Sequence, residues 1–172
     1  MRLGSLALLL TTRKRHSRAS FQSVPLRMES APNRRDTRRA MSEDNVDLAR
    51  RAYEAFNRGD VETVLTLVDE NVEIASRLAP LGEGSYHGHE GVRRWFQNLW
   101  DTFPDWRSEL VELRDAGDIT VGTVRIRGHG RESGAPLDQT IWQVMQWRNG
   151  ECVRLTPYDS EAEALEAAGL SE

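Results

Sequence analysis

The chain has 172 residues, of which 38% are hydrophobic and 29% are charged, a composition typical of one globular domain. A single cysteine excludes an internal disulfide framework, and no apolar run approaches the ~20 residues that a bilayer span needs. Residues 1–40 carry a net charge of +8 (ten basic and two acidic residues), whereas residues 41–172 carry −12 (13 basic and 25 acidic). The cysteine count and the lack of an apolar span lead us to expect a soluble, cytoplasmic domain with no membrane partner. Because an acidic body repels phosphate groups, we also expect no nucleic-acid partner.

The first 40 residues lack the apolar periodicity of a packed element. Residues 3–10 are apolar, but a basic run follows them where a secretory signal would place its cleavage site. The segment is rich in arginine and poor in acidic residues, which is typical of an organelle transit peptide. The alternative interpretation is that the start of the protein has been assigned too far upstream. We predict a disordered basic extension or mis-assigned start over 1–40 and a domain over 41–172.

Three helices are predicted in the first half of the domain. Ser42 is a suitable N-cap for the first, whose apolar residues recur at helical spacing up to a stop at residues 57–59. Asp60 caps a second helix. A third, over about 88–103, carries an apolar stripe and ends at Pro104.

The second half is predicted to be mainly β-structure, because apolar and polar residues alternate between turn signals. Asn149-Gly150 is a strong hairpin signal, and Ser160 begins a capping box that opens a short last helix. The predicted strands cover 72–76, 106–114, 119–131, 138–148 and 151–157, with a loop over 79–85.

Helices followed by a strand meander indicate an α+β fold rather than alternating βαβ units. The apolar face of the sheet must be covered, and the three amphipathic helices are available for this. We therefore predict a cone-shaped, curved antiparallel sheet of about five or six strands, wrapped by three helices from the N-terminal half, with a short C-terminal helix. An interior cavity in such a cone is a natural place for a small ligand.

Three segments, YEAFNRGD (53–60), YHGHEGV (86–92) and WRNGECVRLTPYDSEAEALEAAGL (147–170), resemble the SnoaL-like branch of the nuclear-transport-factor-2-like superfamily. The resemblance covers about residues 44–170. It implies a cone-shaped α+β barrel, often dimeric through the outer sheet face. Members include polyketide cyclases, ketosteroid isomerases, small hydrolases, dehydratases and non-catalytic binding modules, so the family leaves the function open.

The catalytic set of the ketosteroid isomerases is missing from this chain. Counted from the Gly-Asp pair and from the last hairpin turn, its four positions fall on Ala52, Ser76, Phe96 and Gln143. Ser76 does not act as a base unaided, and Gln143 donates a hydrogen bond but not a proton. We therefore do not expect ketosteroid-type isomerisation.

Strand parity predicts which residues line the cavity. With Ser76 and Gln143 facing inward, the inner face is apolar; the same parity places Val153 inward and Cys152 outward. The expected ligand-binding residues are Ser76, Gln143, Tyr53, Phe56, Phe96, Trp100, Ile126, Ile141 and Leu155.

Titratable candidates for acid–base catalysis are few. Asp159 is expected near the cavity mouth, although it directly precedes a helix start and could serve there instead. Tyr53 is the best phenol donor, although aromatic residues at helical spacing often belong to the core. Asp138 is a third, weaker candidate. We expect no metal and no cofactor, since His87-Gly88-His89-Glu90 offers at most two or three ligands. Cys152 is expected to be a small buried hydrophobe.

The outer sheet face is expected to carry Thr140, Trp142 and Val144 beside arginines, which predicts a homodimer interface; packing of Trp142 on arginine stems is the alternative. We expect an apolar pocket for a small hydrophobic molecule, used either for cyclase, isomerase or hydratase-type acid–base chemistry or in a non-catalytic binding or interaction module. The sequence does not decide whether the protein is an enzyme.

Overall fold

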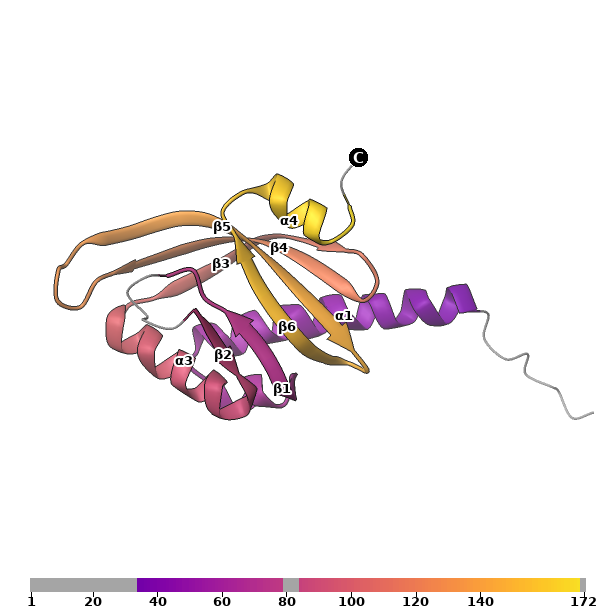
Figure 1. Ribbon diagram of the computed structural model, residues 1–172, viewed down its shortest axis with the longest axis horizontal. Coiled ribbons are helices and arrows are strands. Elements are labelled where there is room, and N and C mark those ends of the chain that lie inside the picture. The colour runs from indigo at the N-terminus through magenta and orange to yellow at the C-terminus, as the bar shows by residue number, and fades with distance from the viewer. Residues whose placement is uncertain (1–33, 79–83, 171–172) are drawn as a thin grey trace, which may run out of the picture. The chain divides into compact units, whose positions relative to one another are not determined.

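The computed structural model describes residues 34–78 and 84–170, with side chains from residue 44 onward (Figure 1). The elements are α1 (Arg34–Asn57), α2 (Val61–Leu65), β1 (Val68–Ala75), β2 (Ser85–His87), α3 (Gly88–Thr102), β3 (Arg107–Asp115), β4 (Ile119–His129), β5 (Pro136–Arg148), β6 (Glu151–Tyr158) and α4 (Glu161–Ala167). This order confirms the predicted α+β class and the short C-terminal helix. Among the described helices, none is long and apolar enough to cross a membrane.

Helix α1 begins at Arg34, eight residues before the expected N-cap, so the predicted domain start at residue 41 falls inside it. The cap at Ser42 is therefore wrong. The residues that precede it are mostly arginine and alanine, which favour helix, and no Gly or Pro separates them from Ser42. The rest of the predicted extension, 1–33, lies outside the described residues, as do residues 79–83 of the predicted loop.

The six strands form one curved sheet in the order β2-β1-β6-β5-β4-β3. Within the described residues β2 and β3 each pair on one side only, so the sheet is open, and the closed barrel implied by the family resemblance is wrong. All neighbours are antiparallel except β1 and β6, which run parallel. No hairpin joins these two strands, since β2, α3, β3, β4 and β5 lie between them in the chain, so they are not constrained to be antiparallel. The short strand β2, of which only Ser85 lies in the predicted loop, was not predicted and pairs with the end of β1.

The β5–β6 hairpin has the predicted two-residue turn. Asn149 and Gly150 both adopt positive φ angles, 54° and 82°, the pattern of a type I′ turn that matches the twist of the strands. The predicted start of α4 is also confirmed, since the Ser160 side chain accepts a hydrogen bond from the backbone N–H of Glu163 at 3.3 Å.

The two faces of the sheet carry separate apolar clusters. Helices α1 and α3 cover the inner face, whereas α4 lies across the opposite face of β4 and β5 (Figure 1). On that outer face Val144 packs with Val121 and Ala164 and is only 3% exposed. Val144, expected at a subunit interface, is therefore covered by the chain's own last helix, while Trp142 is half-buried and Thr140 is exposed.

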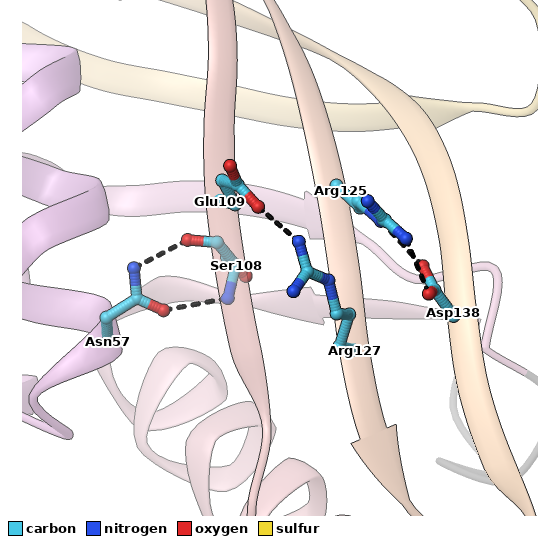
Figure 2. A network of polar contacts seen from close by, with 6 residues as sticks. All are labelled: Asn57, Ser108, Glu109, Arg125, Arg127 and Asp138. Carbon is cyan, nitrogen blue, oxygen red and sulfur yellow. Dashed lines mark hydrogen bonds and ion pairs between the residues drawn. The ribbon is translucent and has the colours of Figure 1, made fainter.

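The end of α1 is fastened to the edge strand β3 by one side chain. The Asn57 amide donates to the Ser108 carbonyl at 2.7 Å and accepts from the Ser108 backbone N–H at 2.8 Å (Figure 2). The amide thus takes the place of a neighbouring strand at this residue and satisfies two backbone groups that an edge leaves open. This contact holds α1 over the inner face, beside the site described next.

Candidate functional site

An inner cavity of about 60 Å³ lies between α1, α3, β1 and the inner sheet face. Apolar side chains form nearly all of its wall. Its polar side-chain atoms belong to Tyr53, Ser108, Gln143 and Cys152 and to the indole N–H groups of three tryptophans. The lining residues are Ala52, Tyr53, Phe56, Val64, Leu67, Val68, Val72, Ile74, Trp95, Trp106, Ser108, Gln143, Met145, Trp147, Cys152 and Leu155.

The main polar contact in this cavity joins α1 to β5. The Tyr53 hydroxyl donates to Oε1 of Gln143 at 2.7 Å. Tyr53 is 7% exposed, and its burial raises the pKa of the phenol, so the hydroxyl keeps its proton across the physiological range. Tyr53 is therefore a hydrogen-bond donor here and does not act as a base.

A glycine in the neighbouring strand makes room for this contact. Gly122 of β4 lies opposite Gln143 in the register of the sheet. A Cβ atom at Gly122 would lie 2.8 Å from the Tyr53 hydroxyl, closer than real Cβ contacts come. The absence of a side chain at position 122 is thus required for the phenol to reach the amide.

Two of the three indole N–H groups at the inner cavity, those of Trp106 and Trp147, are already engaged. Nε1 of Trp106 donates to Oγ of Ser108 at 2.9 Å, and Nε1 of Trp147 donates to Oγ1 of Thr120 at 3.0 Å. These bonds fix both rings and satisfy their only polar atom. The two tryptophans therefore offer the cavity apolar ring surface.

Cys152 lines the inner cavity, so its predicted outward orientation is wrong. The β5–β6 register shifts between Gln146, paired with Arg154, and Trp147, paired with Cys152. Val153 is the extra residue of this bulge, which reverses the alternation of side chains and moves Cys152 inward; Val153 lines neither cavity. Burial raises the pKa of the thiol to about 12, and the Sγ donates to the Arg154 carbonyl at 3.3 Å. The group is a protonated, weakly nucleophilic thiol.

A second, outer cavity of about 60 Å³ adjoins the first. Four residues line both: Trp95, Trp106, Gln143 and Leu155. Those that line only the outer cavity are Ala75, Ser76, Arg77, Leu78, Leu99, Ile126, Gln139, Ile141, Pro157 and Asp159. Gln143 thus stands in the wall between the two cavities.

The outer cavity carries the charged groups. Nη1 of Arg77 lies 3.0 Å from Oδ2 of Asp159, and the guanidinium also lies over the Tyr158 ring, 5.4 Å from its centroid. Both partners of the ion pair are largely exposed, so solvent screens the attraction. The pair joins the segment after β1 to the junction between β6 and α4. Asp159 is the only carboxylate among the described residues that line the two cavities.

The structure brings most of the predicted ligand-binding residues to these cavities. Tyr53 and Phe56 line the inner one, Ser76, Ile126 and Ile141 the outer one, and Gln143 and Leu155 both.

Three other predicted site residues lie elsewhere. Phe96 and Trp100 stack on each other, with ring centroids 5.2 Å apart, and line neither cavity. They belong to the aromatic cluster that joins α3 to α1. Asp138 lies on the outer sheet face, because it alternates with the inward residues of β5, and it forms a bidentate pair with Arg125 at 2.7 and 2.8 Å (Figure 2).

Sequence reasoning missed Trp95, Trp106 and Ser108 as lining residues. Trp95 belongs to the predicted apolar stripe of α3, so its inward position was indicated, but the pattern does not separate core from cavity wall. Trp106 and Ser108 occupy alternate positions at the start of β3, and their bond to each other follows from that spacing. Ser108 carried no apolar signal.

The histidines near the start of α3 are engaged separately. Nε2 of His87 contacts Oγ of Ser85 at 3.1 Å, and Nε2 of His89 contacts the Val68 carbonyl at 3.3 Å. No group of three or more His, Cys, Asp or Glu side chains that could hold a metal ion occurs in the described part of the chain.

Comparison with known proteins identifies the family. The model of the SnoaL-like domain matches residues 49–155, more than half of the chain, and the protein therefore belongs to the SnoaL-like family. No curated protein matches.

Solved structures share the fold. Bal32a from a soil-derived mobile gene cassette is 27% identical over 69% of this chain and 92% of its own, with a TM-score of 0.60. An NTF2-like protein of unknown function from Burkholderia pseudomallei K96243 is 24% identical over 72% and 95%, with a TM-score of 0.62. TerC, co-crystallised with polyporic acid, is 18% identical over 73% and 98%, with a TM-score of 0.61.

Proposed function

We propose that this protein binds a small, largely apolar molecule in the inner and outer cavities and orients it through Gln143. The observation that carries the proposal is the Tyr53–Gln143 pair, a fixed polar contact in an otherwise mostly apolar wall. Binding sites of this kind combine apolar surface with a few placed polar groups. TerC, a protein of the same fold, has been co-crystallised with polyporic acid, which agrees with this use of the fold.

The cavity dimensions limit the ligand. One water needs roughly 10–15 Å³ of such space, so a cavity of about 60 Å³ accommodates about four to six waters. A cavity of about 150 Å³ binds benzene, so a ligand with rings has to occupy the inner and outer cavities together. A ligand that occupies both cavities passes Gln143, because Gln143 lines both.

Filling the inner cavity tests the proposal. Ala52 lines the inner cavity from α1, and Ala52→Leu places three further carbons in it without loss of helix propensity. We expect at least a ten-fold loss of affinity for indene, measured by ligand-observed NMR titration. Ala162→Leu, at an exposed position of α4, is the control and should retain the wild-type affinity. Equal binding by Ala52→Leu and the wild type would contradict a ligand in the inner cavity.

A second candidate function is acid–base chemistry of the polyketide-cyclase type, favoured by the position of Asp159 on the outer cavity. If this carboxylate takes a proton next to a ligand carbonyl, the protein should accelerate exchange of the C2 protons of 1-indanone with deuterated water, followed by proton NMR. Asp159→Asn should abolish the acceleration, whereas Asp138→Asn, which removes the same charge from an arginine-paired carboxylate outside the cavities, should not. If the wild type exchanges these protons no faster than buffer does, acid–base chemistry is contradicted and only the binding function remains.

A further inference from the structure

The Gln143 amide has one acceptor atom, Oε1, and one donor atom, Nε2, and only one of them is engaged. Oε1 accepts the Tyr53 hydroxyl, and nothing in the described part of the chain accepts from Nε2. No fully buried side-chain nitrogen or oxygen in that part lacks a partner, so Nε2 borders open space. Because Gln143 lines both cavities, this space is cavity, and a ligand meets the donor end of the amide.

Tyr53 determines which end of the amide faces the ligand. Its hydroxyl keeps its proton and is held over Gly122, so the amide accepts on that side. Turning the amide over would let its N–H₂ donate to the phenolic oxygen, but the phenolic O–H would then have no acceptor among the described residues. A buried polar group left unpaired costs about 1–3 kcal/mol, enough to keep one orientation dominant.

The other polar atoms of the inner cavity are used mainly as acceptors or are already donating. Ser108 Oγ accepts from Trp106, and the Cys152 thiol donates to the backbone. The donors left for a ligand in the inner cavity are therefore the Gln143 N–H₂, the Ser108 O–H and the Trp95 indole N–H, whereas the acceptors left there are remaining lone pairs on atoms that already take part in a hydrogen bond.

We infer that Tyr53 is a positioning residue that makes this site select apolar ligands bearing a hydrogen-bond acceptor, such as a ring ketone, over ligands bearing an N–H or O–H donor. The inference rests on the proposed function and adds the ligand class to it. The ligand's oxygen would take the Nε2 proton of Gln143, while its rings would lie against Trp106 and Trp147.

Three probes of matched size test this selectivity: 1-indanone, which only accepts, indole, whose N–H only donates, and indene, which does neither. For the wild type we expect dissociation constants in the order 1-indanone, indene, indole, with 1-indanone about 3–10-fold tighter than indene, as one net hydrogen bond provides. Affinities are measured by ligand-observed NMR on the full chain.

Tyr53→Phe removes the phenol and frees the amide to turn. We expect the preference for 1-indanone over indole to fall at least three-fold, mainly because indole gains affinity from the exposed Oε1. Gln143→Met, which keeps length and removes the amide, should bind 1-indanone and indene equally. Tyr158→Phe removes a hydroxyl from a tyrosine that lines neither cavity and should keep the wild-type order.

The outcomes separate the two proposals. Equal binding of all three probes by the wild type, or an unchanged order in Tyr53→Phe, overturns the selectivity inference and leaves the binding function standing. No binding of any probe overturns both. Circular dichroism and thermal melts establish that each variant is folded; if Tyr53→Phe does not fold, Gln143→Met decides, and a retained preference for 1-indanone in that variant overturns the inference.

Discussion

Two weak acids border the inner cavity, the phenol of Tyr53 and the thiol of Cys152. Burial raises the pKa of both, since a charge in this apolar wall would lose its hydration. At neutral pH each group keeps its proton, so the inner cavity provides hydrogen-bond donors and no base. This is why a binding role fits the inner cavity better than proton abstraction does.

The Cys152 pKa predicts a loss of stability at alkaline pH. The folded thiol has a pKa of about 12, against about 9 in the unfolded chain, so above pH 9 the unfolded chain loses a proton that the folded protein keeps. The free energy of unfolding then falls with rising pH, by up to about 1.4 kcal/mol per pH unit for this group. Below pH 9 the contribution is constant. Urea unfolding at pH 8, 9 and 10 measures the slope.

The matched variant is Cys152→Ala, which removes the titrating group. It should be less stable than the wild type at pH 8, because it leaves a small void, but its stability should fall less between pH 9 and 10. Ala162→Leu, which changes no titrating group, should keep the wild-type slope. Parallel curves for Cys152→Ala and the wild type would show that the thiol does not titrate as its burial requires.

At the scale of single elements, the amphipathic patterns predicted most of the fold. Alternation placed Gln143 of β5 and Ile126 of β4 correctly on the inner face, because regular strands keep a period of two. It failed in β6, where the bulge at Val153 brings Cys152 inward. A bulge depends on how two strands pair, and the sequence of one strand does not reveal it.

The candidate site was less predictable than the fold. Tyr53 and Gln143 were expected to line a cavity, but their hydrogen bond depends on Gly122, a residue whose contribution is the absence of a side chain. Phe96 and Trp100 show the converse: an aromatic at helical spacing marks the covered side of α3, but whether it meets a neighbour or a void depends on the packing of α1.

The contact between α1 and β3 predicts that removing the side-chain amide of Asn57 lowers the stability of the protein markedly. Asn57→Ala removes two hydrogen bonds and leaves the Ser108 backbone groups without partners (Figure 2). We expect a loss of about 1–3 kcal/mol in the free energy of unfolding, measured with urea. Gln97→Ala, exposed on α3, is the control and should change stability by less than about 0.5 kcal/mol. Similar losses in both variants would contradict the role of the amide.

At the scale of the whole molecule, we propose that the outer sheet face joins two copies of the chain. Arg125 pairs with Asp138 and Arg127 with Glu109 across neighbouring strands, so the face presents both signs of charge to a second copy (Figure 2). Thr140 is exposed beside them. Because α4 covers Val144, the contact would use the uncovered ends of β4 and β5.

Sedimentation velocity tests this proposal. We expect the wild type to sediment as a dimer at about 10 µM, and Thr140→Arg to sediment as a monomer because it places an unpaired positive charge in the contact. Gln97→Arg adds the same charge on α3 and should remain dimeric. A monomeric wild type would contradict the proposed dimer.

The position of α4 matters for how the protein can be attached to a carrier or a surface. The helix lies on the sheet face that points away from both cavities, and the chain leaves it there (Figure 1). In the proposed dimer, a bulky carrier attached beyond α4 would stand on the outer side of the sheet and hinder the pairing of two copies, without covering the side on which the two cavities lie. Such a fusion product would allow the proposed ligand binding to be measured on a single copy.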